Sequence, residues 1–267
     1  MTRSFLFSCC AVLCLQLSLS ASRADDSDLE TVRKAAERGD AEAQIALAKA
    51  YFNGSGAPKD DQQAAEWIRK AADQGHPKAQ YDLGVFYNRG LGVQRDPSEA
   101  VKWYRKSAEQ DFVEAELQLG QLYYVGGAGV EQNYPEAAQW LTKAAAHGKT
   151  WAQNTLGVMC EHGLGVKQDP SEAVDWYRKA ADQGDAKGQS NLGRVYSTGS
   201  GVEKDLVKAY QWLTLSANQN EITAAKLLVW VEPALTPEQV TEGKRLVADW
   251  KEQAGTKRGE GEARGER

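Results

Sequence analysis

Three kinds of residue in this chain could do chemistry: recurring glycine pairs, three histidines and a cysteine at position 160. Glycine pairs such as Gly54/Gly56 and Gly90/Gly92 are found in phosphate-binding loops, where backbone amides approach the phosphate closely. A dinucleotide site needs G-x-G-x-x-G after a strand, and a P-loop needs G-x-x-x-x-G-K-[ST]. Neither pattern occurs, so we interpret the recurring pair as a turn.

The histidines and serines show no catalytic spacing. His76, His147 and His162 do not have the i, i+4 spacing that places two metal ligands on one helix face. No G-x-S-x-G pattern marks a nucleophile elbow. Aspartate and glutamate are plentiful, but those at fixed spacing fit helix caps. We therefore expect no catalytic residue, no metal site and no cofactor.

A period of 36 residues organises the chain, with one interval of 37 where Gly127 is inserted. Its anchor, the Leu slot, holds Leu47, Leu83, Leu119, Leu156 and Leu192. The next position, the small slot, holds Ala48, Gly84, Gly120, Gly157 and Gly193. Four residues past the leucine, the Tyr slot holds Tyr51, Tyr87, Tyr123, Cys160 and Tyr196. The Trp slot follows later and holds Trp67, Trp103, Trp140, Trp176 and Trp212.

Each copy predicts two helices joined by a glycine-rich turn. Spacings of four, as in Ala79, Leu83 and Tyr87, place the apolar residues on one face of a first helix. The second helix is expected to begin after an N-cap residue: Asp60, Asp96, Asn133, Asp169 or Asp205. Gln or Glu three positions later completes a capping-box pattern in four copies. It is expected to end at a residue that tolerates the left-handed conformation: Gly75, Asp111, Gly148, Gly184 or Asn220.

The combined pattern, A-x-x-x-L-G-x-x-Y followed by G-x-G-V, D, W and A-A, resembles the Sel1-like repeat, a relative of the tetratricopeptide repeat. The resemblance covers about residues 25–230. It implies an all-α, right-handed α/α superhelical solenoid that serves as an adaptor, and it implies no reaction. The departures are single residues: Ala48, Asp111, Cys160 and Gly188.

The expected organisation extends beyond the five repeats at both ends. The repeats are expected at 40–75, 76–111, 112–148, 149–184 and 185–220, within a repeat region of 40–221. A half-repeat helix at 25–39 should precede them, since terminal repeats of solenoids are atypical. A partial repeat and a capping helix should occupy 222–252. The Gly-, Glu- and Arg-rich segment 253–267 has no apolar face and is expected to be disordered.

Residues 1–24 have the composition of a cleavable signal peptide. Arg3 precedes an apolar stretch over 5–19, and Ser22 and Ala24 are small residues before a cleavage point, with Ser18-x-Ser20 or cleavage after Ala21 as the alternatives. The apolar stretch is short for a membrane span. We expect a bacterial protein that is exported to the periplasm or secreted. A lipoprotein is the alternative, because Cys9, Cys10 and Cys14 lie here.

Composition narrows the classes of partner. The formal charge is −5 and the isoelectric point is near 5.4, which disfavours nucleic acid and anionic membrane surfaces. After removal of the signal peptide, Cys160 is the remaining cysteine. It fills a Tyr slot, so we interpret it as a buried thiol, the alternative being a reactive or intermolecular one.

The resemblance also implies where a partner would bind. In tetratricopeptide-like solenoids the first helices line a concave groove, at positions −5, −2, +2, +5 and +6 from the leucine. The candidate groove residues are Ile45, Phe52, Lys78, Tyr81, Val85, Asn88, Leu117, Gln121, Tyr124, Trp151 and Asn154. Aromatic and aliphatic side chains there could anchor a peptide, or they could pack internally. Lys187 and Arg194 in the last copy could meet an acidic group.

The favoured hypothesis is a non-enzymatic, exported scaffold that binds a peptide or protein partner in this groove. Two alternatives stay open. One is a hydrolase of cell-wall or β-lactam-like substrates, an activity attributed to a cysteine-rich branch of the Sel1-like family. The other is a structural subunit of an envelope complex.

Overall fold

The structure is a computed structural model that describes residues 29–127 and 129–265. The expected signal peptide lies outside them. The described residues are all-α apart from an isolated antiparallel bridge between Gly127 and Val130. A helix over 29–37 comes first. The others are α2 (Ala41–Asn53), α3 (Asp61–Asp73), α4 (Pro77–Arg89), α5 (Pro97–Ala108), α6 (Val113–Val125), α7 (Tyr134–Ala146), α8 (Thr150–His162), α9 (Pro170–Asp182), α10 (Ala186–Thr198), α11 (Leu206–Ala217), α12 (Ile222–Val231), the 3₁₀ turn η1 (Glu232–Ala234) and α13 (Pro237–Gly265).

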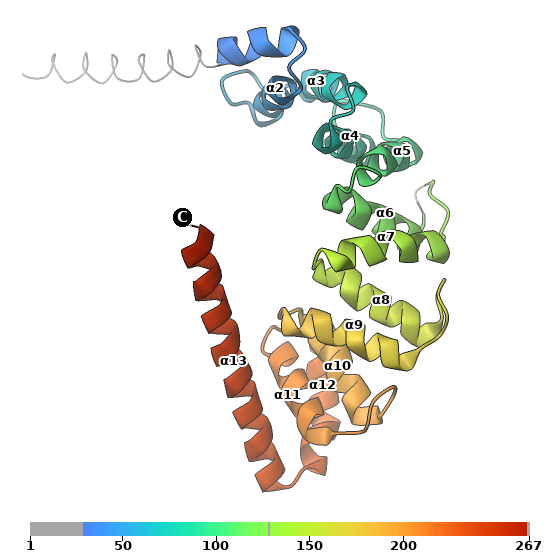
Figure 1. The fold of residues 1–267 in the computed structure, drawn as a ribbon, viewed down its shortest axis with the longest axis vertical. Coiled ribbons are helices and arrows are strands. Elements are labelled where there is room, and N and C mark those ends of the chain that lie inside the picture. The colour runs from blue at the N-terminus through green and yellow to red at the C-terminus, as the bar shows by residue number, and fades with distance from the viewer. Residues whose placement is uncertain (1–28, 128, 266–267) are drawn as a thin grey trace, which may run out of the picture. The chain divides into compact units, whose positions relative to one another are not determined.

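The helices form an α/α solenoid of repeated pairs, which confirms the predicted fold class. The chain divides into two compact units, and the division falls within α6. The first unit extends to Leu119 and includes Gly126–Glu131, and the second comprises Gly120–Val125 and the chain from Gln132 onward. Within each unit the two helices of a repeat lie side by side, as α4 and α5 or α8 and α9 do (Figure 1).

The second helices begin where the caps predict. The side chain of each expected N-cap residue accepts a hydrogen bond from a backbone amide of the first turn. In a capping box, the backbone amide of the N-cap residue would donate to the Glu or Gln side chain three positions later. The cap's own amide donates instead to the Tyr-slot carbonyl, as Asp96 N does to Tyr87 O at 2.9 Å. This bond ties the end of the first helix to the start of the second.

The ends of the second helices also match the prediction. All five expected residues have positive φ, and Asp111 (58°) and Asn220 (64°) are the non-glycine residues that adopt it among those described. The amide that follows each one donates back to the last helical turn, as His76 N does to Ala71 O at 3.3 Å. This is the six-to-one bond of a Schellman ending.

The small slot sets the distance between the two helices of a repeat. A Cβ atom added at Gly84 would lie 2.6 Å from the Tyr104 ring, and one added at Gly157 would lie 2.5 Å from the Tyr177 ring. A Cβ atom added at Gly193 would lie 2.6 Å from the Leu213 side chain. Glycine is required here because the facing side chain fills the space that a Cβ would occupy.

Buried glutamines connect neighbouring helices through polar contacts. Three residues before the Leu slot, the glutamine Nε2 donates to a carbonyl of the preceding second helix, and its Oε1 accepts from a glutamine 30 residues later. Four copies use these pairs: Gln44 with Gln74, Gln80 with Gln110, Gln153 with Gln183, and Gln189 with Gln219. Because the amides of Gln44, Gln80, Gln153 and Gln189 are almost fully buried, satisfying both ends of each avoids a desolvation penalty.

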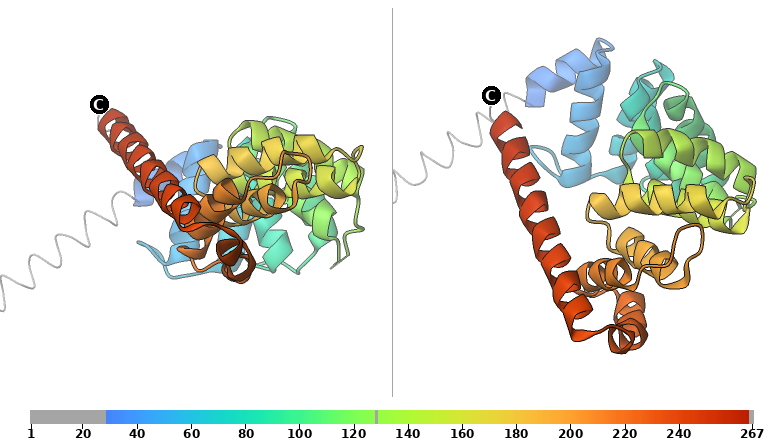
Figure 2. Two further views of the ribbon diagram at one scale, coloured as in Figure 1. Left: turned by 90° about the horizontal axis from the view of Figure 1, so that it is seen from below. Right: turned by 60° about the horizontal axis from the view of Figure 1, so that its bottom comes forward.

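The C-terminal end differs from the expected one. A capping box at Thr236 and Gln239 forms with both of its bonds. Helix α13 packs on α11 (Figure 2), and the rings of Trp250 and Trp212 meet edge-on. The capping helix was expected to end by residue 252, before a disordered tail at 253–267, but it continues to Gly265. A helix that is already formed extends without a new nucleation cost, and Glu, Lys, Arg and Ala favour the helical state.

Filling the small slot should destabilise a repeat. We expect Gly84→Ala to lower the free energy of unfolding by about 1–2 kcal/mol, because the clash with Tyr104 outweighs the higher helix propensity of alanine. Urea denaturation monitored by circular dichroism measures the change. Ala48 stands in the small slot of the first copy, where Ile68 occupies the position of Tyr104. Adding Tyr104→Ile should therefore recover part of the loss, while Gly255→Ala, with open space around it, should not destabilise.

Candidate functional site

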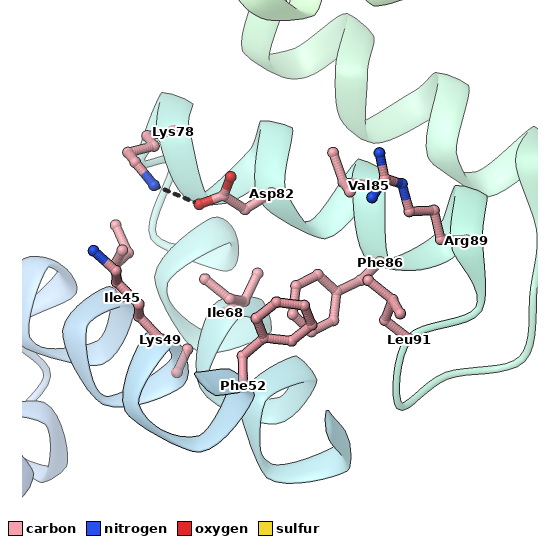
Figure 3. Close-up of a pocket in the computed structure, with 11 residues that line it drawn as sticks. Ile45, Lys49, Phe52, Ile68, Lys78, Asp82, Val85, Phe86, Arg89 and Leu91 are labelled. Atoms are coloured by element: carbon pink, nitrogen blue, oxygen red, sulfur yellow. Dashed lines mark hydrogen bonds and ion pairs between the residues drawn. The ribbon is translucent and has the colours of Figure 1, made fainter. Parts of the chain in front are cut away.

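A pocket of about 250 Å³ opens between α2 and α4 in the first unit (Figure 3). We call it the α2–α4 pocket. It is lined by Ile45, Ala48, Lys49, Phe52, Ile68, Lys78, Asp82, Val85, Phe86, Arg89 and Leu91. Seven of these side chains are apolar and four are charged, an arrangement typical of a binding site with an apolar interior and polar groups that orient the ligand.

The apolar interior is built by two successive first helices and the second helix between them. The rings of Phe52 on α2 and Phe86 on α4 are tilted against each other, with centroids 5.8 Å apart (Figure 3). Ile45 and Ile68 are almost fully buried beside them. Because these side chains also belong to the core of the unit, the pocket wall is held rigidly.

The charged rim has an excess of positive charge. Lys78 Nζ donates to Asp82 Oδ2 at 2.6 Å, so those two charges compensate each other. Lys49 and Arg89 are exposed and form no ion pair within the described part of the chain. Lys59 lies 5.6 Å from the centroid of the Phe52 ring, but its charge is compensated by Asp61, 3.7 Å away. The rim therefore favours a ligand that carries negative charge beside an apolar group.

Four of the eleven predicted groove residues share this pocket: Ile45, Phe52, Lys78 and Val85. Others pack within their own unit instead. Tyr81 lies against Tyr104 and Phe112, with ring centroids 5.6 and 5.4 Å apart. Asn88 lies seven residues further along the same helix, and its backbone carbonyl accepts a hydrogen bond from Arg95 Nε at 2.9 Å. Leu117 and Gln121 are half-buried on α6.

The remaining predicted residues belong to the second unit and make contacts of their own. Tyr124 meets Tyr134 and Trp151 edge-on, with centroids 5.7 and 6.2 Å apart. Asn154 is buried, and its Oδ1 accepts a hydrogen bond from Asn191 Nδ2 at 2.8 Å. Tyr124 and Trp151 are half-buried and pack on each other, and contact of these side chains with a partner stays a prediction.

Several pocket residues were not among the predicted ones. Asp82 and Phe86 lie one residue before and three residues after the Leu slot, and Leu91 lies in the glycine-rich turn. For Asp82 and Phe86 a signal was available, because the matching positions in other copies hold different residue types. A groove defined by five positions on the first helix excludes the turn and the second helix, which is why Leu91 and Ile68 were missed.

An ion-pair network joins α8 and α10 in the second unit. Arg194 donates two hydrogen bonds to Glu161, at 2.9 and 2.6 Å, and the Tyr177 hydroxyl donates a third at 2.7 Å. Burial alone would raise the pKa of Glu161, but the bonds from Arg194 and Tyr177 outweigh it and hold the pKa below its usual value. Burial, followed by the neighbouring Glu161 carboxylate, raises the pKa of Tyr177.

The histidines occupy structural positions. His76 caps α4 by accepting from Ala79 N, and its other ring nitrogen lies 2.9 Å from Glu42. His147 and His162 lie at the C-terminal ends of α7 and α8. Within residues 29–127 and 129–265, no group of three or more potential metal-binding side chains gathers. In the same ranges, no helix has both the length and the apolar character needed to cross a membrane.

The Glu161 network should make stability depend on pH. A carboxylate with a lowered folded-state pKa stabilises the fold above its unfolded pKa of about 4.3, and this contribution is lost as the pH falls through the folded pKa. We expect Arg194→Met to cost about 1–3 kcal/mol at pH 7 and much less at pH 3, as measured by urea denaturation. Arg245→Met, which removes an exposed ion pair on α13, should change little. A loss of the same size at both pH values would contradict the role assigned to Glu161.

Comparisons with known proteins place the repeats in a family. The sequence pattern described as Sel1 repeat matches residues 41–76, 77–112, 113–149, 152–185 and 186–221. No curated protein matches the chain. Repeats of this kind generally act as non-enzymatic scaffolds for protein interaction.

Two solved structures are similar over most of the chain. A Sel1 repeat protein from Oxalobacter formigenes is 34% identical with a TM-score of 0.73, and the match covers 90% of this chain and 98% of that protein. A protective antigen, c5321, from uropathogenic Escherichia coli strains, displaying an SLR fold, is 31% identical with a TM-score of 0.56. That match covers 91% of this chain but 61% of the antigen. The chain therefore belongs to the Sel1 repeat family.

Proposed function

We propose that this protein is a non-enzymatic scaffold that binds a peptide or protein segment in the α2–α4 pocket. The observation that carries the proposal is the combination of an apolar interior and a cationic rim in one pocket of the first unit. Apart from Ala48, Ile68 and Phe86, which occupy packing positions, the pocket side chains occupy positions whose residue types differ between copies. The position of Ile45, for example, holds Tyr81 in the second copy and Ser190 in the fifth. Such variation indicates that the fold does not dictate these residue types.

The pocket suits a segment with one apolar anchor and an adjacent carboxylate. An aromatic or aliphatic side chain would fill the space between Phe52 and Val85, where burial of apolar surface supplies most of the binding free energy. A neighbouring aspartate, glutamate or C-terminal carboxylate would then meet Lys49 or Arg89 at the rim. Charges of this kind mainly provide specificity and fast association.

We also propose that the scaffold acts outside the cytoplasm, in the periplasm or after secretion. The support is the composition of residues 1–24, with a basic start, an apolar stretch and small residues before Asp25. Expression of the full chain in a bacterial host, followed by mass spectrometry of its N-terminus, tests this. We expect a mature chain that starts close to Asp25 and is released by osmotic shock. An intact N-terminus in the cytoplasmic fraction would contradict export.

The binding proposal is tested with a peptide library displayed on phage and selected on the full chain. Enriched sequences should share an aromatic or aliphatic residue next to Asp or Glu, and synthetic copies are then titrated by fluorescence anisotropy. We expect Val85→Trp, which fills the pocket, and Lys49→Glu/Arg89→Glu, which reverses the rim charge, each to weaken binding about tenfold or more.

The matched control carries the same change of charge elsewhere. Lys204→Glu/Lys226→Glu alters two exposed lysines of the second unit and should leave the affinity within about twofold. Circular dichroism shows whether each variant is folded. Equal weakening by the control and the rim variant would mean that net charge, and not the pocket, attracts the peptide. Selected peptides that bind all variants alike would refute the pocket.

A further inference from the structure

The fourth repeat departs from the others at two positions that contact each other elsewhere in the array. In the first, second and fifth repeats, an arginine from the preceding second helix donates to the hydroxyl of the Tyr-slot tyrosine. Three such pairs are Arg33 with Tyr51, Arg69 with Tyr87 and Arg178 with Tyr196. In the fourth repeat the Tyr slot holds Cys160, and the matching arginine position holds Thr142. Both partners of the contact have thus been replaced by small side chains.

These two replacements coincide with a cavity of about 170 Å³. It lies in the second unit, between α7, α8, the following turn and α9. Its lining consists of Thr142, Leu156, Cys160, Val166, Lys167, Asp169, Glu172 and Trp176. A cavity of about 150 Å³ is large enough to hold a benzene ring.

The second repeat has an equivalent hollow of about 430 Å³, although it holds both the tyrosine and the arginine. The equivalent hollow there is lined by Arg69, Tyr87, Val93, Gln94, Arg95 and Asp96, so the tyrosine ring and the guanidinium group form its wall. In the fourth repeat the lining reaches inward to Leu156 and Trp176, the Leu and Trp slots of the helix pair. The cavity is therefore the same hollow, opened inward where the ring and the guanidinium are missing.

The cavity wall combines apolar surface with groups that can form hydrogen bonds. Thr142 Oγ1 donates to Ala138 O, which leaves its oxygen able to accept. Glu172 Oε1 accepts from Trp176 Nε1 at 3.2 Å and holds a carboxylate at the edge of the cavity. Burial, with Glu172 and Asp169 nearby, raises the pKa of Cys160 to about 11, so the thiol is neutral at physiological pH. A flat ring that carries one hydroxyl matches this wall.

We propose that this cavity, defined by Thr142, Cys160 and Trp176, is a binding site for a phenol-type ring. The ring could belong to a tyrosine side chain of a partner or to a small phenolic molecule. In either case it would take the place that Tyr51, Tyr87 and Tyr196 fill in their own repeats. None of the cavity residues lines the α2–α4 pocket, so this site is separate from the one proposed for the peptide anchor.

The test uses the full chain and p-cresol, which has the structure of a tyrosine side chain. Binding is followed by saturation-transfer NMR and by the rate at which iodoacetamide alkylates Cys160, read by mass spectrometry of the peptide that contains it. We expect p-cresol at about 1–10 mM to bind and to slow alkylation several-fold, while cyclohexanol should do so less. If neither signal changes with p-cresol, the proposal is wrong.

Two double variants provide opposite controls. Thr142→Arg/Cys160→Tyr restores the pair found in other repeats and should abolish p-cresol binding while raising Tm. Arg69→Thr/Tyr87→Cys should open the matching cavity in the second repeat and create a second site. If Thr142→Arg/Cys160→Tyr does not fold, Arg69→Thr/Tyr87→Cys and the alkylation of Cys160 in the unmodified chain still test whether the cavity binds a phenol ring. Unchanged p-cresol binding in the folded first variant, or no added site in the folded second, would overturn the assignment.

The source of the ring is distinguished by a second probe, the peptide Gly-Tyr-Gly. Protection of Cys160 by this peptide at the same concentration as p-cresol would support a partner's tyrosine side chain. Protection by p-cresol but not by the peptide would support a small phenolic ligand. Gly-Leu-Gly serves as the control, and equal protection by both peptides would count against recognition of a phenol ring.

Discussion

The contact between the small slot and the facing side chain of the second helix is the constraint on which the array depends. With glycine in that slot, the helices approach until a tyrosine ring or a leucine lies directly on the backbone, as Tyr104 does at Gly84. Interhelical distances of 8–10 Å follow from the side chains at the crossing. The first copy meets the same constraint differently, since Ala48 is accompanied by Ile68 at the position of Tyr104.

Each repeat must keep this helix contact, its helix caps and its buried glutamine pairs. The residue types can therefore differ between copies only at the remaining positions. Both proposed sites arise from such differences. The α2–α4 pocket is lined by the packing residues Ala48 and Ile68 together with side chains that change from copy to copy. The cavity beside Cys160 lies where two small residues replace the Tyr and Arg of other copies. In a solenoid, where each repeat contacts mainly its neighbours, a local difference of this kind alters one surface without disturbing the rest.

The repeat period was sufficient to predict the helix pairs, their N-caps and the left-handed residues at Asp111 and Asn220. Those features depend on neighbours in the sequence. The groove prediction was weaker, because whether Tyr81 faces a partner or packs on Phe112 depends on how successive helices approach each other. The N-cap amides were also missed, since their acceptor lies on the preceding helix. By contrast, the buried glutamine recurs at a fixed distance before the Leu slot, so sequence reasoning could have found it.

The central claim is that partner recognition resides in the α2–α4 pocket and that the packing slots only maintain the fold. Hydrogen–deuterium exchange of the full chain, with and without a saturating selected peptide, tests this most directly. The account predicts slower exchange confined to α2, α4 and the turn that contains Leu91. Protection restricted to the second helices, or to the second unit without any change in α2 and α4, would contradict it.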